Sequence, residues 1–340
     1  MQQHYLDYAL EQLIQILKIP SPTGFTDNVS TYIFDELTRL GYSPEKTVKG
    51  GVFTELGGSG KGLLMTAHVD TLGGIVCDIK LNGRLKISPL GGLNVQNIEG
   101  ENVEIHTRSG RVYTGTFQFE NASAHVNPEY KTAKRTFDNM EVVIDETSWA
   151  LDVERGDFVC FEPRPVITAS GYIKSRFLDD KLSCAILLAF AKYAKDECLN
   201  RKVYLHFTVF EEVGHGGAGS VPVDVSDMLA IDMGCVGEGL TCQETFVSIC
   251  AKNSHGPSNY SFVTELINAA KKHNLKYALD VYPSYSSDAD AGLKAGYDIR
   301  HCTIGPGVYA SHGYERSHIE GLKNTFDLIV NYCLKNVELL

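Results

Sequence analysis

The chain has little positive charge, no long apolar run and no stretch of low-complexity composition. Its 340 residues include 31 Lys and Arg against 42 Asp and Glu, which gives a net charge of -11. Nucleic-acid binding relies on clustered Lys and Arg, so this excess of acid argues against a nucleic-acid partner. No apolar run approaches the ~18 residues of a membrane span, so we expect no membrane contact either.

Paired cysteine motifs are also missing. The nine cysteines are dispersed and form no C-x-x-C pair. Scattered thiols in apolar stretches are typical of reduced, core-filling cysteines, and they argue against a disulfide framework or a cysteine-ligated zinc site. The N-terminal stretch lacks the basic start and the small-residue cleavage site of a signal peptide. We therefore predict a folded cytoplasmic protein.

Carboxylates are present where apolar segments end. In residues 201–210, RKVYLHFTVF, apolar residues alternate with others and predict a buried strand, which leads into VFEEVGHGGAGS. Glu211 and Glu212 come where that strand meets the glycine-rich turn. Neighbours on an extended backbone point in opposite directions, so one glutamate could bind a metal while the other transfers protons. A solvated strand end would explain an isolated Glu-Glu pair more simply.

His68 and Asp70 follow a second apolar segment, GLLMTAHV. In a His-x-Asp arrangement the imidazole can bind a metal while the carboxylate holds the ring. Taken alone, the tripeptide fits a buried structural histidine about as well. Asp179 and Asp180 precede a helical segment with one apolar face, where aspartates also serve as N-caps and as partners of the helix dipole.

Two more segments repeat this arrangement. Asp232 ends DMLAIDMG, and His312 follows a segment that passes through Gly-Pro-Gly. Ligands of open α/β sheets bind at the carboxyl ends of the strands, so we expect these groups to converge. A structural explanation must account for each position separately, whereas one metal centre accounts for all of them. Carboxylates and imidazoles suit zinc, cobalt or manganese.

The middle of the chain has a different pattern. Asn82-Gly83 and Ser109-Gly110 are hairpin signals, and the flanking segments are rich in β-forming residues. We predict an all-β insert over residues 74–165 that divides an α/β catalytic domain into residues 1–73 and 166–340. Self-association is the expected purpose of the insert. Trp149, the single tryptophan, is expected to pack in the core or at an interface.

The quoted segments resemble one known family. TAHVDTLGGIV, FLDDKLSCA, VFEEVGHGGA, AIDMG and YASHGYE occur in the order and spacing of the tetrahedral aminopeptidases, which include the glutamyl and deblocking aminopeptidases. The resemblance covers nearly the whole chain. It implies a mixed-sheet, zinc-peptidase-like α/β catalytic domain with a PDZ-like β insert used for dimerisation. It also implies a homo-oligomer, in which dimers assemble into a tetrahedral dodecamer.

The resemblance further implies a role for each candidate residue. Five residues would hold two divalent ions, zinc or cobalt or else manganese: His68, Asp179, Glu212, Asp232 and His312. Asp179 would bridge the ions, His68 and Asp232 would complete the first site, and the remaining two would complete the second. Glu211 would be the general base and Asp70 would support His68. Asp180 and His318 stay open as alternatives to Asp179 and His312.

These roles predict a metal-dependent aminopeptidase that removes N-terminal residues from short peptides by means of a water activated by two metals. One alternative is a related amidohydrolase that deacylates N-acylated amino acids. Some relatives carry a cellulase label, but glycoside hydrolysis normally uses two carboxyl groups that flank the bond rather than a metal cluster. The non-enzymatic alternative is an assembly module that keeps the fold without the activity.

Overall fold

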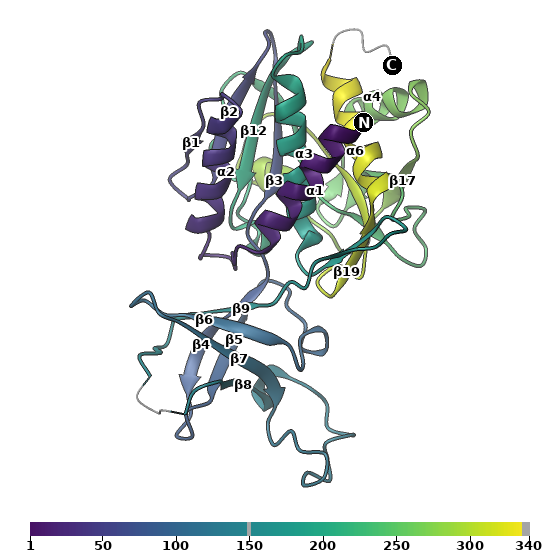
Figure 1. Cartoon of the computed structure of the whole chain (residues 1–340). Coiled ribbons are helices and arrows are strands. Elements are labelled where there is room, and N and C mark those ends of the chain that lie inside the picture. Colours follow the sequence, from purple (N-terminus) through teal and green to yellow (C-terminus); the bar gives the residue numbers. More distant parts are fainter. Residues whose placement is uncertain (148–150, 335–340) are drawn as a thin grey trace.

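The computed structural model describes residues 1–147 and 151–334, so Trp149 lies outside the described residues. The chain forms an α/β body and a separate β-barrel, and Figure 1 shows the body above the barrel. The α/β class with a mixed sheet, predicted from the sequence, is confirmed. No helix within the two described ranges combines the length and the apolar character that crossing a membrane requires.

A mixed sheet of 13 strands forms the centre of the body, and its main path runs β1-β2-β12-β3-β13-β18-β19-β11-β10. Strand β3 lies parallel to both β12 and β13, and β13 lies parallel to β18. The strands are β1 (Glu45–Lys46), β2 (Val52–Gly57), β3 (Gly62–His68), β10 (Val166–Ile167), β11 (Tyr172–Ser175), β12 (Lys202–Thr208), β13 (Val225–Ile231), β14 (Gly234–Val236), β15 (Val247–Asn253), β16 (Gly256–Pro257), β17 (Tyr277–Val281), β18 (Arg300–Tyr309) and β19 (Glu315–His318).

Helices cover both faces of this sheet. They are α1 (Gln3–Leu17), α2 (Asp27–Arg39), α3 (Leu178–Ala194), α4 (Tyr260–Lys272), α5 (Asp288–Lys294) and α6 (Ile319–Cys333). Helix α3 contacts α1, α6 and the sheet (Figure 1), and nearly all its residues are buried. A helix that is apolar on all sides belongs in an interior, which explains why α3 carries more than the single apolar face expected from the sequence.

Strand β3 shows how the core fixes the position of the site. Every residue of β3 is buried. Leu63 and Met65 belong to the large core cluster, whereas Leu64 packs on the opposite face with Ala289 of α5. A strand covered on both faces has a continuous apolar sequence. The polar residue that ends it, His68, is therefore held at a rigid edge.

The inserted segment closes into a six-stranded barrel in the order β4-β5-β8-β7-β6-β9. Its strands are β4 (Gly73–Ile79), β5 (Leu85–Leu90), β6 (Asn102–His106), β7 (Val112–Phe119), β8 (Met140–Ile144) and β9 (Phe158–Phe161). Both hairpins predicted from Asn-Gly and Ser-Gly are present, between β4 and β5 and between β6 and β7. Gly83 and Gly110 have φ values of 76° and 87°, a conformation that favours glycine.

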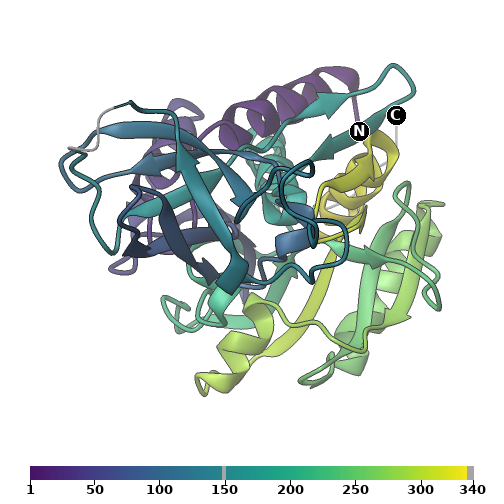
Figure 2. The same cartoon turned by 90° about the horizontal axis from the view of Figure 1, so that it is seen from below.

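A buried ion pair ties the barrel to the body. Arg176 Nη1 lies 2.5 Å from Glu101 Oε2, and both side chains are buried. Arg176 Nη2 also donates to the backbone oxygen of Asn97 at 2.8 Å, within the 3₁₀ turn η1 (Val95–Asn97). Viewed from the barrel side in Figure 2, the barrel overlies part of the body and leaves the green segments uncovered. The segment around Asn97 is thus fixed against the body.

A buried histidine gives the body a predictable sensitivity to acid. His206 on β12 is buried, and Nδ1 of its ring has no hydrogen-bond partner among the described residues. Burial, together with the nearby Lys49, lowers its pKa from 6.5 to about 3. The unfolded chain therefore binds a proton at a higher pH than the folded chain does, so stability falls as the pH drops from about 6.5 towards 3.

We expect His206 to reduce the free energy of unfolding by about 2 kcal/mol between about pH 7 and pH 5. Urea unfolding at both pH values measures this loss. His206→Gln cannot titrate in this range, so its loss between the two pH values should be smaller by about the same amount. An equal acid sensitivity in both proteins would assign the effect to other groups.

Candidate metal centre

The predicted site residues follow different elements but meet at one edge of the sheet. His68 is the last residue of β3, and Asp232 directly follows the neighbouring parallel strand β13. His312 lies three residues beyond the end of β18, and Asp179 lies in the first turn of α3. This is the convergence at the carboxyl ends of parallel strands that the sequence predicted.

Two groups of potential ligands share one aspartate. In the first, ligand atoms of His68, Asp179 and Asp232 lie within 4.8 Å of one another; in the second, those of Asp179, Glu212 and His312 do. Asp179 Oδ1 lies 3.1 Å from Nε2 of His68, and its Oδ2 lies 3.6 Å from Nε2 of His312. The two oxygens of one carboxylate thus face two imidazoles, which is the arrangement that a bridging ligand requires.

The two glutamates do not lie on an extended strand, so that prediction was wrong. Strand β12 ends at Thr208, Phe210 takes a positive φ of 68°, and Glu211 begins the 3₁₀ turn η3 (Glu211–Val213). The turn still separates the two side chains. Glu211 Oε2 lies 3.7 Å from His68 Nε2, whereas Glu212 Oε2 lies 3.7 Å from Nε2 of His312.

Asp70 contacts its neighbours differently from the expected arrangement. His68 Nδ1 lies 2.9 Å from the backbone oxygen of Asp70 and 3.7 Å from its carboxylate. That carboxylate accepts hydrogen bonds from Thr23 Oγ1 at 2.7 Å and from the backbone N–H groups of Glu211 and Glu212 at 3.2 and 3.4 Å. The backbone of Asp70 therefore orients the His68 ring, while its side chain holds the turn that carries both glutamates.

The alternative ligands lie outside both groups. Asp180 Oδ2 accepts from the backbone N–H of His68 at 3.3 Å. His318 Nδ1 accepts from the backbone N–H of Glu320 at the start of α6, and its Nε2 lies 2.9 Å from the oxygen of Ser170. Of each alternative pair, the structure brings Asp179 and His312 to the centre.

Glu315 is a buried carboxylate that the sequence did not single out. It accepts hydrogen bonds from the backbone N–H of Asp179 at 3.0 Å and from that of His312 at 3.0 Å. Burial, reinforced by the nearby Asp179 carboxylate, raises the pKa of Glu315. One side chain thus holds the backbone of two candidate ligands. Its only signal in the sequence was its place in YASHGYE, three residues after His312.

Burial crowds negative charge at this site. It raises the pKa of Glu211 and of Glu212, in each case with repulsion from a neighbouring carboxylate, and it raises that of Asp232 to about 8. A cation among these groups would offset both the burial and the repulsion. The donors are carboxylate oxygens and imidazole nitrogens, a set that suits zinc, cobalt or manganese. The residues therefore fit a centre of divalent metal ions.

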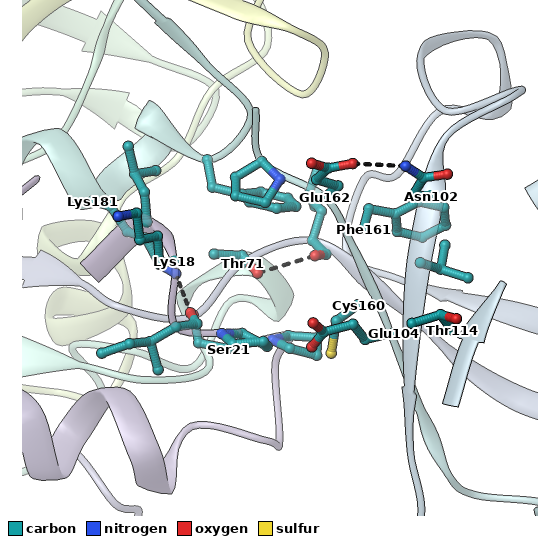
Figure 3. Close-up of a pocket in the computed structure, with 18 of the residues that line it drawn as sticks. Lys18, Ser21, Thr71, Asn102, Glu104, Thr114, Cys160, Phe161, Glu162 and Lys181 are labelled. Atoms are coloured by element: carbon teal, nitrogen blue, oxygen red, sulfur yellow. Dashed lines mark hydrogen bonds between the residues drawn. The ribbon is translucent and has the colours of Figure 1, made fainter. Parts of the chain in front are cut away.

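A cavity of about 490 Å³ opens beside these side chains. Its walls include residues of both ligand groups and Glu211, together with uncharged residues such as Met233 and Tyr285. A different cavity of about 370 Å³ lies between body and barrel (Figure 3). Lys181 lines this cavity, and its Nζ donates to the backbone oxygen of Ile19 at 2.8 Å. None of the predicted site residues lines it.

The chain is similar to known aminopeptidases. The family model of the M42 glutamyl aminopeptidases matches residues 50–328. "Putative aminopeptidase YhfE" of Bacillus subtilis (strain 168) is 42% identical over 334 residues, which cover 95% of this chain and 96% of that protein. The glutamyl aminopeptidase of Lactococcus lactis subsp. cremoris (strain MG1363) is 27% identical over 248 residues, which cover 66% and 70% of the two chains.

Solved structures share the fold over nearly the full length. The TET1 peptidase of Pyrococcus horikoshii, described as able to assemble into a tetrahedron or a large octahedral shell, matches with a TM-score of 0.87. The match covers 96% of this chain and 100% of that chain, at 22% identity. An aminopeptidase of Desulfurococcus kamchatkensis matches with a TM-score of 0.86 at 21% identity, covering 96% and 94% of the two chains.

Proposed function

The chain belongs to the M42 glutamyl aminopeptidase family, and on this basis we propose that it is a metal-dependent aminopeptidase that removes N-terminal residues from short peptides. The observation that carries the proposal is the pair of ligand groups joined by Asp179 at the wall of an open cavity. A peptide N-terminus entering that cavity meets the candidate ligands and Glu211 together.

In this proposal five residues hold two divalent ions: His68, Asp179, Glu212, Asp232 and His312. Asp179 is common to both ions. When bound, the ions would polarise the scissile carbonyl and lower the pKa of water, which is the established use of two metals in aminopeptidases. We propose zinc or cobalt, with manganese as a further candidate, because the donor set combines imidazoles with carboxylates.

Glu211 is the proposed general base. It accepts the proton of the attacking water and returns it to the leaving amine. Its carboxylate is placed for this because the Asp70 side chain holds the backbone of the turn by hydrogen bonds at 3.2 and 3.4 Å. A free N-terminal amine could bind one of the ions or a carboxylate of the centre, whereas an acylated one could not, so we expect a free N-terminus to be favoured.

We also propose the division into residues 1–73, 74–165 and 166–340, with the middle segment as a PDZ-like dimerisation domain. The closed barrel from β4 to β9 supports this division. We propose dimers that assemble into a dodecamer because a TET1 structure of similar fold is described as a dodecamer. All nine cysteines are free thiols, which supports a cytoplasmic location.

The cavity predicts which N-terminal residues the enzyme accepts. Apart from the proposed ligands and Glu211, the described residues that line the cavity include no Lys, Arg, Asp or Glu. These other lining residues are Gly214, Met233, Cys235, Ser254, His255, Ser284, Tyr285, Ser286 and Ser311. A charged side chain that is buried without a partner costs more than 1 kcal/mol. We therefore expect alanyl and leucyl substrates to exceed glutamyl and lysyl substrates in kcat/KM by about tenfold or more.

A panel of aminoacyl-p-nitroanilides tests the proposal. Protein stripped with a chelator should be inactive and should recover on addition of zinc, cobalt or manganese. N-acetylated versions of each substrate serve as controls. Cleavage of acylated amino acids alone would establish the deacylase alternative instead. A preference for glutamyl or lysyl substrates would contradict the predicted specificity but would still support the proposed aminopeptidase activity.

A further inference from the structure

The insert reaches the candidate metal centre through a short segment that follows β5 and includes η1. His312 Nδ1 lies 3.2 Å from the backbone oxygen of Gly92, a residue 220 positions earlier in the chain. Asn97 Nδ2 donates to the backbone oxygen of His312 at 3.2 Å. Two residues of the insert thus contact both the ring and the backbone of a single proposed ligand.

This contact requires glycine. A Cβ added to Gly92 would lie 2.5 Å from Nδ1 and 2.8 Å from Cε1 of His312. At the preceding residue, Gly91, φ is +68° and an added Cβ would lie 2.6 Å from Leu72 Cδ2 and 3.3 Å from Glu212 Cβ. The backbone of the insert therefore approaches the second ligand group as closely as two residues without side chains allow.

The contact also sets the chemistry of the ring. When Nδ1 donates its hydrogen to a backbone carbonyl, Nε2 is left with a free lone pair that can bind a metal. For His68 the body supplies that carbonyl, from Asp70 at 2.9 Å. For His312 the insert supplies it. The His312 side chain is 39% exposed, against 1% for His68, so His312 has less surrounding protein to fix its ring.

We propose that residues 91–97 of the insert are a positioning element of the metal centre, which fixes the tautomer and the orientation of His312. The barrel would then position a ligand of the second metal site, in addition to its proposed role in dimerisation. The proposal rests on the proposed function in that it takes Glu212 and His312 as ligands. Arg176 fixes this element by donating to the Asn97 oxygen at 2.8 Å, so the position of the barrel is coupled to one of the two metal sites.

The test compares metal binding by the wild type, Gly92→Ala and Gly237→Ala. A Cβ at Gly237 meets no atom within 4 Å, and Gly237 has no positive φ, so this variant is a matched control. Competition with a chelator gives the affinity of the full-length protein for each zinc or cobalt ion. We expect Gly92→Ala to lower the affinity for one ion by about 10- to 100-fold, while the other ion and the control stay at the wild-type level.

A second variant keeps the test decisive if Gly92→Ala fails to fold. Asn97→Ala creates no clash and removes only the hydrogen bond to the His312 backbone, so we expect a smaller loss for the same ion. The absorption spectrum of bound cobalt should change in both variants, with circular dichroism and oligomeric mass unchanged. Unchanged affinity in both variants, or an equal loss at both sites, would overturn the inference. A wild type that binds no metal would overturn the proposed function instead.

Discussion

Glu211→Gln is expected to lower kcat by about 10²- to 10⁴-fold while the metal content stays at the wild-type level. Glutamine keeps the size of the side chain but cannot accept the proton of the attacking water. Glu211 belongs to neither ligand group, although its Oε2 lies 3.7 Å from His68 Nε2. Turnover of an alanyl substrate and metal analysis of the same sample measure the two effects.

Glu238→Gln is the control for this substitution, because Glu238 is an exposed glutamate beyond β14. It should keep wild-type turnover. Near-normal turnover in Glu211→Gln would remove Glu211 from the role of general base. Loss of metal together with activity would instead make Glu211 a ligand, and the proton would then need another acceptor.

Asp179→Asn is expected to weaken both metal ions, because Asp179 is the only residue common to the two ligand groups. Loss of a supporting partner alone can cost 10- to 100-fold in metal affinity, so the loss of a shared ligand should exceed about 100-fold for each ion. Activity should fall with occupancy. Asp232→Asn should weaken mainly one ion, since Asp232 contributes to a single group.

The neighbouring aspartate provides a matched control. Asp180 is also buried, but its side chain belongs to neither group. Asp180→Asn should therefore retain both ions. Two measurements, metal stoichiometry and the affinity of each ion, distinguish the variants. If Asp180→Asn lost both ions while Asp179→Asn kept them, the bridging role would move to Asp180.

Sequence reasoning predicted that the candidate ligands converge because most of them follow an apolar segment. The buried strands that lead to His68 and Asp232 consist largely of apolar residues, and the carboxyl ends of parallel strands meet at one edge. The same logic did not extend to the conformation of Glu211 and Glu212. Phe210 takes a positive φ, which the sequence does not predict because phenylalanine rarely adopts this conformation. A 3₁₀ turn therefore replaces the extended strand at the two glutamates.

Other parts of the site depend on contacts between distant segments. In the sequence Glu315 is an ordinary acidic residue, and only the fold brings its carboxylate to the backbone N–H of Asp179. In the sequence Gly92 is one residue of a Gly-Gly pair in a loop, and only the fold brings its backbone oxygen to the His312 ring. Periodicity describes how a segment meets the core, but it carries no information on which backbone carbonyl lies beside a given imidazole ring.

The pairing of the first and last barrel strands has a consequence for protein engineering. Gly74 on β4 lies opposite Val159 on β9, so the chain enters and leaves the barrel side by side. A barrel from a relative could therefore be grafted at this one point without stretching either connection. Such a chimera would need a glycine that matches Gly92, because a graft that restores assembly but carries a bulkier residue there would displace His312.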